Sequence, residues 1–411
     1  MTTSVDVAVI GAGAAGLAAG ETLARAGVDH LVLEARHRVG GRVHTVQAGG
    51  YPIDLGGEWL HSADENPLAA AAEAAGFTIN RDPPRWRRQA FNVDFTPQEQ
   101  AEFAAAFADM DVRLEAAAKT GVDRPGSEVL DPKGKWNHLL NAFSAYYNGA
   151  EWDQVSVLDY DAYEDSGVNW RVTEGYGTAI TALAGEAMVR TGVSVQVIDH
   201  SGAEVIRLIT DHGVLEARKV IVAVPTPILA RELVRFDPVI PAKIDAALGL
   251  PLGLADKVFL GLSKPEAFPV EGHLFGNVRV TGAGSYGLRP YGRPMIECFL
   301  GGRHARELED AGEGASTDFA IAELVRLLGS DMRRQLTPLA ATAWGADPHS
   351  LGSYSHAWPG HVGDRAVLAA PVDDRLFFAG EACSATFFST AHGAWITGEE
   401  AAKAVIGALR R

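Results

Sequence analysis

The chain contains 411 residues, of which 47% are apolar and 21% charged, and it carries a formal net charge of −16. The length allows two to three domains, and the composition is that of an ordinary globular protein. The acidic excess argues against nucleic-acid binding through a basic face. No run of about 18 apolar residues marks a membrane-spanning helix.

Two cysteines are present, Cys298 and Cys383, without a CxxC motif or a Cys/His cluster. They predict a reducing compartment, and hence a cytoplasmic location, and no metal site.

The first structural unit begins close to the start of the chain. Residues 5–10 are apolar except for Asp6 and predict a buried parallel strand. Residues 14–26 predict a helix that ends at Gly27, and residues 31–33 predict the next strand. The first strand leads directly into a glycine-rich turn, so we expect a core strand here and not a signal sequence.

That turn has the spacing of a dinucleotide-binding motif. Gly11 permits the tight turn, Gly13 allows the backbone to approach a pyrophosphate, and Gly16 permits close packing of helix on strand. The helix N-terminus supplies free N–H groups for an anion, and Glu34 at the end of the next strand can accept hydrogen bonds from a ribose. The pattern predicts a bound dinucleotide.

Two helices further along have clear start signals. Residues 66–76 predict a helix with Asn66 as N-cap and Gly76 as its stop. The capping box Thr96-Pro97-Gln98-Glu99 opens an alanine-rich helix that extends to about Lys119.

The later strands lead to a second motif at the opposite end. Residues 193–198 and 203–209 alternate, and the second run, Gly213 and residues 215–224 predict a β-meander that ends at Pro225. Residues 376–380 predict a buried strand, and a helix follows from about Gly393. A strand and helix at each end predict one cofactor held by both termini, and therefore a redox enzyme.

The motifs together resemble the flavin-containing amine oxidases, which include monoamine oxidases, polyamine oxidases and lysine-specific histone demethylases. The resemblance rests on Gly40-Gly41-Arg42, Gly56-Gly57-Glu58-Trp59-Leu-His61, Phe378-Ala-Gly380-Glu381 and Gly393-Ala394. It implies an α/β fold in which a Rossmann-like FAD-binding domain is interleaved with an α+β substrate-binding domain. We expect residues 1–80, 193–240 and 348–411 in the first domain, and residues 81–192 and 241–347 in the second.

Finer matches are closest to the polyamine oxidases. Trp59-Leu-His61 resembles their Trp-Ile-His, in which the histidine lies near the substrate amine. The stretch from Trp344 to Tyr354 is similar to one shared by polyamine oxidases and histone demethylases, and implies aromatic faces for a cationic amine. Lys257 lies in a segment similar to the one whose lysine holds a water against flavin N5.

Three departures refine the resemblance. Ser353 stands where monoamine oxidases attach FAD through cysteine, so we expect non-covalent FAD. Thr390 stands where they place a second cage tyrosine, so we expect an incomplete aromatic cage. Residues 97–140 contain no long coiled-coil excursion, which argues against a chromatin function.

The resemblance gives a set of candidate site residues. Lys257 and His61 are the candidate catalytic residues, and Trp344, Tyr354 and Thr390 the candidate substrate contacts. The candidate FAD contacts are Gly11, Gly13, Ala15, Gly16, Glu34, Ala35, Arg36, Gly41, Arg42, Gly56, Gly57, Glu58, Trp59, Val205, Gly380, Glu381, Thr390 and Ala391. The implied reaction removes a hydride from an amine, polyamine-like by preference, to flavin N5, with reoxidation by O2 giving H2O2.

Alternatives stay open at this point. An L-amino-acid oxidase needs a cation for the substrate carboxylate, and Arg279, Arg289 and Arg293 are candidates. A flavin-dependent desaturase and a non-catalytic flavoprotein are two further possibilities. The acidic stretch 151–165 lines a cation path or forms a solvated face, and the oligomeric state is open.

Overall fold

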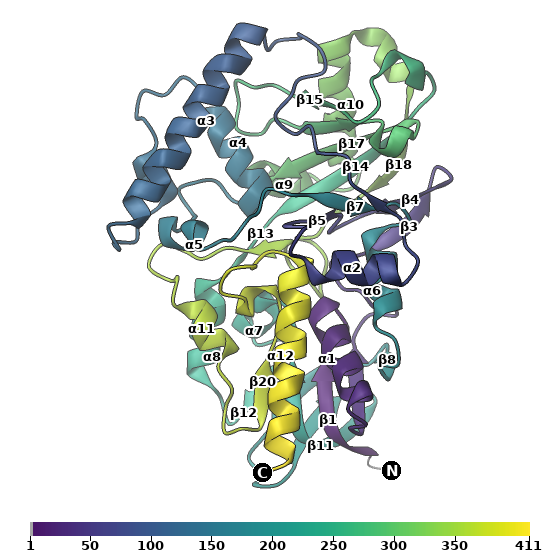
Figure 1. Ribbon diagram of the computed structural model, residues 1–411, viewed down its shortest axis with the longest axis vertical. Coiled ribbons are helices and arrows are strands. Elements are labelled where there is room, and N and C mark those ends of the chain that lie inside the picture. The colour runs from purple at the N-terminus through teal and green to yellow at the C-terminus, as the bar shows by residue number, and fades with distance from the viewer. Residues whose placement is uncertain (1–2) are drawn as a thin grey trace.

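The computed structural model describes residues 3–411, which form two stacked lobes with both chain ends in the lower one (Figure 1). The lower lobe is built on an eight-stranded sheet in the order β12-β9-β10-β11-β1-β2-β8, with β20 paired to the end of β11. Its strands are β1 (Thr3–Ile10), β2 (His30–Glu34), β8 (Val189–Thr191), β9 (Val195–Asp199), β10 (Ile206–Thr210), β11 (Gly213–Val222), β12 (Arg235–Asp237) and β20 (Leu376–Phe378).

The predicted βαβ unit is confirmed. Strands β1 and β2 pair in parallel, and helix α1 (Ala14–Arg25) connects them. The predicted meander is present as β10 and β11, which pair antiparallel, and β9 pairs antiparallel with β10. Strand β1 adds to β11 in parallel on the other side, so the meander and the first motif share one sheet.

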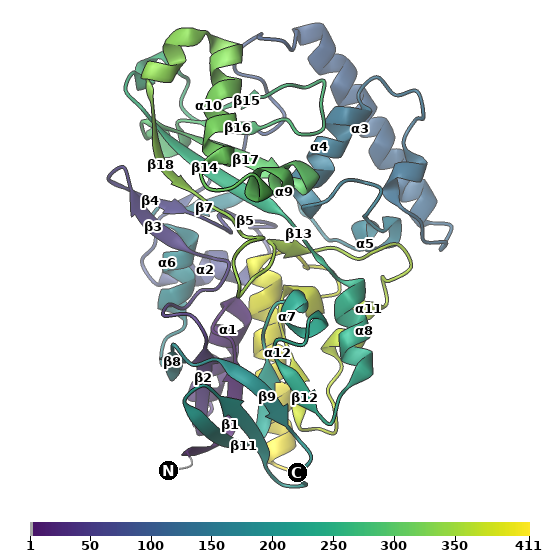
Figure 2. The same ribbon diagram turned by 180° about the vertical axis from the view of Figure 1, so that it is seen from behind.

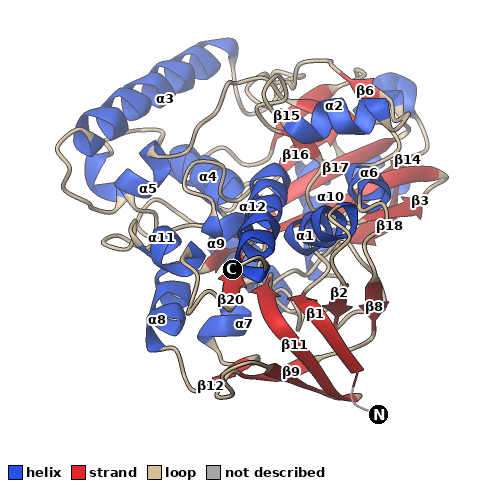
Figure 3. Cartoon of the chain, turned by 60° about the horizontal axis from the view of Figure 1, so that its bottom comes forward, coloured by secondary structure: helices blue, strands red, loops and turns tan. Residues whose placement is uncertain are grey.

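The two terminal motifs meet along a helix pair. Helix α12 (Ala391–Leu409) packs beside α1, as Figures 1 and 3 show, and both helices cover the same face of the sheet. Close approach is possible because a Cβ at Gly398 would lie only 2.1 Å from the Ala15 carbonyl oxygen. Gly398 therefore allows α12 to pack closely against α1, which brings the two terminal motifs together.

Two of the expected domain boundaries differ from the packing. Strand β8, placed with the second domain from the sequence, pairs in parallel with β2. Helix α8 (Pro241–Gly249), also placed there, packs on α7 (Thr226–Ala230) and α11 (Asp364–Ala369) against the lower core. Both β8 and α8 follow short connections whose composition does not change. The sequence therefore does not show which of the two domains each one joins.

The upper lobe is a five-stranded antiparallel sheet in the order β15-β16-β17-β14-β18, best seen from behind in Figure 2. Helices α9 (Gly302–Asp310) and α10 (Ala315–Leu328) pack on it. The strands are β14 (Ala255–Leu262), β15 (Gly272–Phe275), β16 (Ser285–Leu288), β17 (Met295–Gly301) and β18 (Leu336–Ala341). Short 3-10 turns lie at η1 (Gly126–Val129), η2 (Pro265–Ala267), η3 (Pro290–Gly292), η4 (Ser330–Arg334) and η5 (Glu381–Cys383).

A helical arm flanks this sheet. It consists of α3 (Pro97–Ala118), α4 (Asn137–Asn148) and α5 (Val157–Asp161), around an aromatic core that includes Phe103 and Phe143. The predicted capping box is present, since Thr96 Oγ1 accepts from the Glu99 N–H at 3.3 Å and Glu99 Oε2 accepts from the Thr96 N–H at 3.1 Å. The start signal thus fixed the first residue of α3.

Short strands lie between the two lobes and connect them. They form three small sheets: β3 (Thr45–Ala48) with β4 (Tyr51–Asp54), β5 (Trp59–Leu60) with β7 (Trp170–Val172) and β6 (Ile79–Asn80), and β13 (Leu252–Gly253) with β19 (Tyr354–Ser355). Helices α2 (Pro67–Ala74) and α6 (Tyr176–Leu183) lie beside them. As predicted, Asn66 caps α2, with its Oδ1 accepting from Leu68 N. Among residues 3–411, no helix is long and apolar enough to cross a membrane.

Candidate active site

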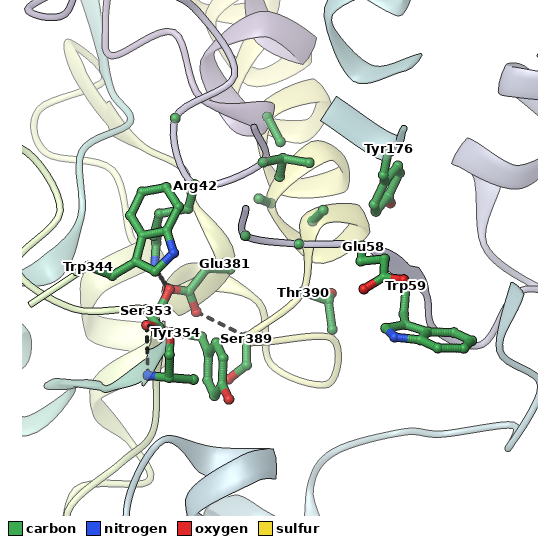
Figure 4. Close-up of a pocket in the computed structure, with 18 of the residues that line it drawn as sticks. Arg42, Glu58, Trp59, Tyr176, Trp344, Ser353, Tyr354, Glu381, Ser389 and Thr390 are labelled. Atoms are coloured by element: carbon green, nitrogen blue, oxygen red, sulfur yellow. Dashed lines mark hydrogen bonds and ion pairs between the residues drawn. The ribbon is translucent and has the colours of Figure 1, made fainter. Parts of the chain in front are cut away.

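One continuous cavity of about 1470 Å³ lies where the lobes meet, and both contribute to its wall. In Figure 4, Glu58 and Trp59 lie on one side of the view, Trp344 and Tyr354 on the other, and Thr390 between them. The structure places all but two of the predicted site residues in this wall. The two exceptions are Gly16 and Val205.

Gly16 lies behind the wall, in the first turn of α1. A Cβ on it would lie 1.8 Å from the Gly11 carbonyl oxygen, which matches the packing role expected of the third glycine.

Val205 is a correction. Val205 is 37% exposed and directly precedes β10. It lies near the turn between β9 and β10, whereas Val195 pairs with Thr210 at the other end of the hairpin. The alternating run 203–209 suggested one strand, but pairing begins only at Ile206. The part of the meander that reaches the cavity is Val193-Ser194-Val195.

One end of the cavity presents backbone donors. Gly11 adopts a φ of +98° and Gly13 has no atom within 4 Å of an added Cβ, so the turn before α1 is open to the cavity. Neither α1 nor α12 has an acidic residue in its first turn, and both N-termini line the cavity. Two positive helix ends facing one space suit an anion such as a pyrophosphate.

Glu34 closes this end. Its two carboxylate oxygens accept from Ala12 N and Arg36 N, each at 2.8 Å. The Arg36 guanidinium pairs with Asp347 through two hydrogen bonds, at 2.6 and 2.7 Å. Glu34 is therefore fixed against the glycine turn, where a ribose hydroxyl can reach the same carboxylate.

Arg42 and Glu381 link the two terminal motifs in the middle of the wall. Arg42 Nη1 donates to Glu381 Oε1 at 2.9 Å and to the Ser353 carbonyl at 2.8 Å. Burial opposes ionisation of Glu381, but Arg42 and the Ser355 hydroxyl outweigh it and lower its pKa. The charge of Arg42 is thus largely balanced within the protein.

Ser353, Tyr354 and Thr390 all use their hydroxyls within the fold. Ser353 Oγ accepts from Ala255 N at 2.9 Å and donates to the Ala255 carbonyl at 2.8 Å. Tyr354 donates to the Tyr146 carbonyl, and Thr390 caps α12 by accepting from Gly393 N at 3.0 Å. The three hydroxyls are therefore already hydrogen-bonded within the protein. The surfaces that these residues present to the cavity are mainly apolar.

His61 has a fixed orientation. Its Nδ1 lies 2.6 Å from Asn169 Oδ1, and Asn169 Nδ2 donates to the Gly167 carbonyl, which sets the amide with its oxygen toward the ring. Nδ1 is then the protonated nitrogen and Nε2 carries the lone pair. Burial lowers the pKa of His61, so the neutral form is favoured.

Trp86 completes this corner and was missed from the sequence, as was Asn169. The Trp86 ring lies 4.6 Å from that of Trp59 and 6.3 Å from that of His61, measured between centroids. The Pro-Arg-Trp-Arg segment around it showed only as a change of composition. Asn169 lies far from His61 in the chain, so no local pattern pointed to the pair.

Lys257 lies in a buried ionic cluster. Its Nζ contacts Glu58 Oε2 at 2.8 Å, Glu297 Oε1 at 2.7 Å and the Asp54 carbonyl at 3.2 Å. Burial lowers the pKa of Lys257, but the two carboxylates outweigh it and raise it. Lys257 is therefore a fixed cation.

Arg171 extends the cluster. It pairs with Glu58 at 3.4 Å and Glu271 at 2.6 Å, and its guanidinium lies 4.5 Å from the Trp59 ring centroid. Sequence reasoning missed Arg171, Glu271 and Glu297. Glu297 left one signal, as the only charged residue in the apolar strand Met295–Gly301.

The arginines considered for an amino-acid carboxylate do not reach the cavity wall. Arg279 pairs with Glu99 on the surface. Arg289 donates to the Phe268 carbonyl, and Arg293 to the carbonyls of Pro52 and Thr173. Of the acidic stretch 151–165, only Tyr160, Tyr163 and Asp165 line the cavity.

With this geometry in place, comparison with known proteins identifies the family. Residues 14–406 match the model of the flavin containing amine oxidoreductases. The chain belongs to that family. It is 32% identical to polyamine oxidase 2 of Arabidopsis thaliana, over 98% of this chain and 88% of the relative. It is 30% identical to lysine-specific histone demethylase 1 homolog 2 of the same plant, over 98% of this chain but 58% of the relative.

Solved structures confirm the fold. Putrescine oxidase bound to putrescine superimposes with a TM-score of 0.80 at 20% identity, covering 99% of this chain and all of the other. Cyclohexylamine oxidase from Brevibacterium oxydans IH-35A gives 0.79 at 21% identity with the same coverage. The predicted α/β class, the family resemblance and the assignment as a flavin enzyme are thereby confirmed.

The residues present fit the flavin that the family implies. The paired helix N-termini and the open Gly13 suit the pyrophosphate, and Glu34 suits the ribose. Gly56 and Gly57 also line the wall, and a Cβ at Gly56 would lie 1.9 Å from the Arg42 carbonyl oxygen and 3.2 Å from the Trp344 indole. Close packing of the backbone on Arg42 therefore requires glycine at position 56.

Proposed function

We propose that the protein uses non-covalently bound FAD to oxidise a primary or secondary amine, with a polyamine-like substrate favoured and O2 as the acceptor that yields H2O2. The observation that carries this is His61, which lines the cavity with its Nδ1 held by Asn169 and with a pKa that burial lowers. A protonated amine has no lone pair to assist hydride loss, so a neutral base beside it is required.

The chain's own residues have separate tasks in this scheme. His61 accepts the ammonium proton at Nε2, and the faces of Trp344 and Tyr354 border the amine. Lys257 keeps a positive charge next to the site throughout. FAD, when bound, supplies the hydride acceptor.

The deciding experiment is an anaerobic panel read by flavin bleaching, with diamines, N-acetylated polyamines, benzylamine and L-amino acids, followed by peroxide assay in air. We expect bleaching by putrescine or spermidine. Bleaching by benzylamine alone would leave amine oxidation standing and remove the polyamine preference. Bleaching by none of the amines would remove the function.

An L-amino acid is the second candidate, because one observation favours it. Arg85, Arg87 and Arg88 are exposed and line the cavity, although the whole chain is acidic. A carboxylate on the substrate has a partner there. Bleaching by L-amino acids in the same panel distinguishes this candidate.

The form of FAD attachment and the location belong to the same proposal. Ser353 has no thiol for attachment, so acid precipitation is expected to release the flavin into the supernatant; flavin that stays on the pellet contradicts this. Both cysteines are free in the structure, which supports a reducing, cytoplasmic location.

A further inference from the structure

Asp256 is a buried carboxyl group in β14, directly before Lys257, and the proposed reaction gives it no task. It is 2% exposed and does not line the cavity, whereas Lys257 does. Neighbouring residues of a strand point to opposite faces of the sheet, which accounts for this difference. A buried carboxyl group needs hydrogen-bond partners to offset the loss of water. The partners of Asp256 belong to the segment that carries Trp344.

This segment follows the last residue of β18. Asp256 Oδ1 accepts from the Thr342 hydroxyl at 2.7 Å and from the Trp344 N–H at 3.0 Å. The Thr342 hydroxyl oxygen also accepts from the Lys257 N–H at 2.8 Å, and Thr342 N donates to the Lys257 carbonyl at 2.9 Å. The pairing of β14 with β18 ends at Ala341. The Thr342 side chain thus continues the contact between the strands where the backbone turns toward Trp344.

Lys257 and Trp344 also hold one and the same piece of the cavity wall. Lys257 Nζ donates to the Asp54 carbonyl at 3.2 Å. Trp344 Nε1 donates to the next carbonyl in the chain, that of Leu55, at 3.1 Å. These two carbonyls directly precede the glycine pair 56–57, which lines the cavity. The position of Trp344 relative to Lys257 therefore sets the position of this part of the wall.

The two ends of the link depend on Asp256 to different degrees. The Lys257 ammonium keeps its two carboxylate salt bridges whether or not Asp256 is present. The Trp344 N–H has Asp256 as its acceptor, and the next N–H, that of Gly345, donates to Glu309 Oε1 at 2.7 Å. Removal of the Asp256 carboxyl group therefore frees the Trp344 N–H and leaves the Lys257 ammonium in place.

We propose that Asp256 is a positioning residue for the substrate end of the cavity. Through Thr342 and the Trp344 N–H it fixes the Trp344 indole relative to Lys257, and so it shapes the wall that borders the amine. An indole held at its backbone N–H and at Nε1 is already ordered, so substrate binding does not have to order it. The inference rests on the proposed amine oxidation, because it assigns the amine to the Trp344 face.

The test compares Asp256→Ala with Asp256→Asn in the FAD-loaded enzyme. Asp256→Ala leaves two buried donors without an acceptor, so we expect amide hydrogen exchange in residues 342–345 to be faster by about tenfold or more. The apparent Kd for putrescine, from anaerobic flavin reduction, should rise about tenfold. Reoxidation by O2 should keep its wild-type rate, because Lys257 stays in place. Asp256→Asn retains an oxygen acceptor and should recover most of the exchange protection and of the affinity.

Thr342→Val is a milder variant that removes the hydroxyl and keeps the side-chain shape. It is expected to change exchange and Kd in the same direction as Asp256→Ala but by less, and it decides the question if Asp256→Ala does not fold. Loss of both hydrogen bonds of the hydroxyl without any change in exchange at residues 342–345 would overturn the inference.

Glu323→Ala is the matched control for a merely structural effect. Glu323 is a buried carboxyl group of the same lobe, and neither it nor its partners line the cavity. It accepts three hydrogen bonds, from Asn277 N, Gly284 N and Tyr286 OH. We expect Glu323→Ala to lower the unfolding temperature while exchange at residues 342–345 and the Kd for putrescine keep their wild-type values.

The outcomes separate this inference from the proposed function. Where putrescine reduces the flavin, an unchanged Kd in Asp256→Ala would overturn the inference, as would an equal rise of the Kd in Glu323→Ala. If no amine bleaches the flavin, the proposed oxidation is removed, and faster exchange confined to the Asp256→Ala and Thr342→Val variants still supports the positioning of Trp344. Bleaching with unchanged exchange in both variants would do the reverse.

Discussion

The two ends of the cavity are built by different means. The dinucleotide end consists of glycine turns, helix N-termini and one carboxylate, and its geometry comes mainly from the backbone of β1, α1 and α12. The substrate end consists of charged and aromatic side chains from segments far apart in the chain, such as Glu58, Arg171 and Glu297. The backbone end is sensitive to added side-chain volume at its closely packed glycines, whereas the substrate end is sensitive to single charges.

The largest effect is expected from a substitution at the dinucleotide end. Gly16→Ala places a Cβ 1.8 Å from the Gly11 carbonyl oxygen, so we expect loss of the folded flavoprotein, a destabilisation of about 3 kcal/mol or more. Thermal unfolding and flavin absorbance measure it. Gly13→Ala is the matched control, since its Cβ meets no atom within 4 Å; we expect it to fold and to bind FAD more weakly. A stable, yellow Gly16→Ala would contradict the account.

The next effect concerns the charged end. Lys257→Met leaves Glu58 paired with Arg171 but removes the salt-bridge partner of the buried Glu297, so we expect a destabilisation of about 3–5 kcal/mol by denaturant unfolding. FAD is expected to remain bound, and one or both half-reactions to slow. Adding Glu297→Gln to Lys257→Met removes the carboxylate charge that Lys257 had neutralised and should recover part of the stability. No recovery would argue against the charge explanation.

Asn169→Asp tests the orientation of His61. A carboxylate at Nδ1 favours the imidazolium, so the pKa of His61 is expected to rise by about 1–3 units. His61 accepts a proton only above its pKa, so the acidic limb of kcat/KM should move to higher pH by the same amount. Asn169→Leu removes the hydrogen bond without adding a charge and serves as the control. An acidic limb unchanged in Asn169→Asp would separate His61 from proton transfer.

The smallest effect lies at the rim. Arg85→Ala and Arg88→Ala remove exposed positive charge from the entrance, so kcat/KM for putrescine should rise about two- to threefold at low salt. The gain should fade near 0.15 M salt, where the screening length is about 8 Å. An unchanged or lower kcat/KM for putrescine at low salt would show that these arginines do not repel the substrate.

The same contrast explains what the sequence could predict. The glycine motifs, Glu34 and the capping signals act over a few residues, so the βαβ unit, α2, α3 and the dinucleotide end were readable. Lys257 and His61 were reached through family resemblance. Asn169, Trp86, Arg171 and Glu297 meet them only after folding, across lobe and strand connections that local patterns do not encode. The prediction of Val205 as an FAD contact was wrong for a related reason, because the alternation of residues does not show where strand pairing begins.

The most direct test of the central claim, that one end holds FAD while the other carries out the proton chemistry, is anaerobic rapid mixing of putrescine with wild type and His61→Ala. The account predicts equal FAD content in both proteins and flavin reduction slower by about 10²-fold or more in the variant. Equal content with equal reduction rates would contradict it, as would an active wild type whose variant loses its flavin.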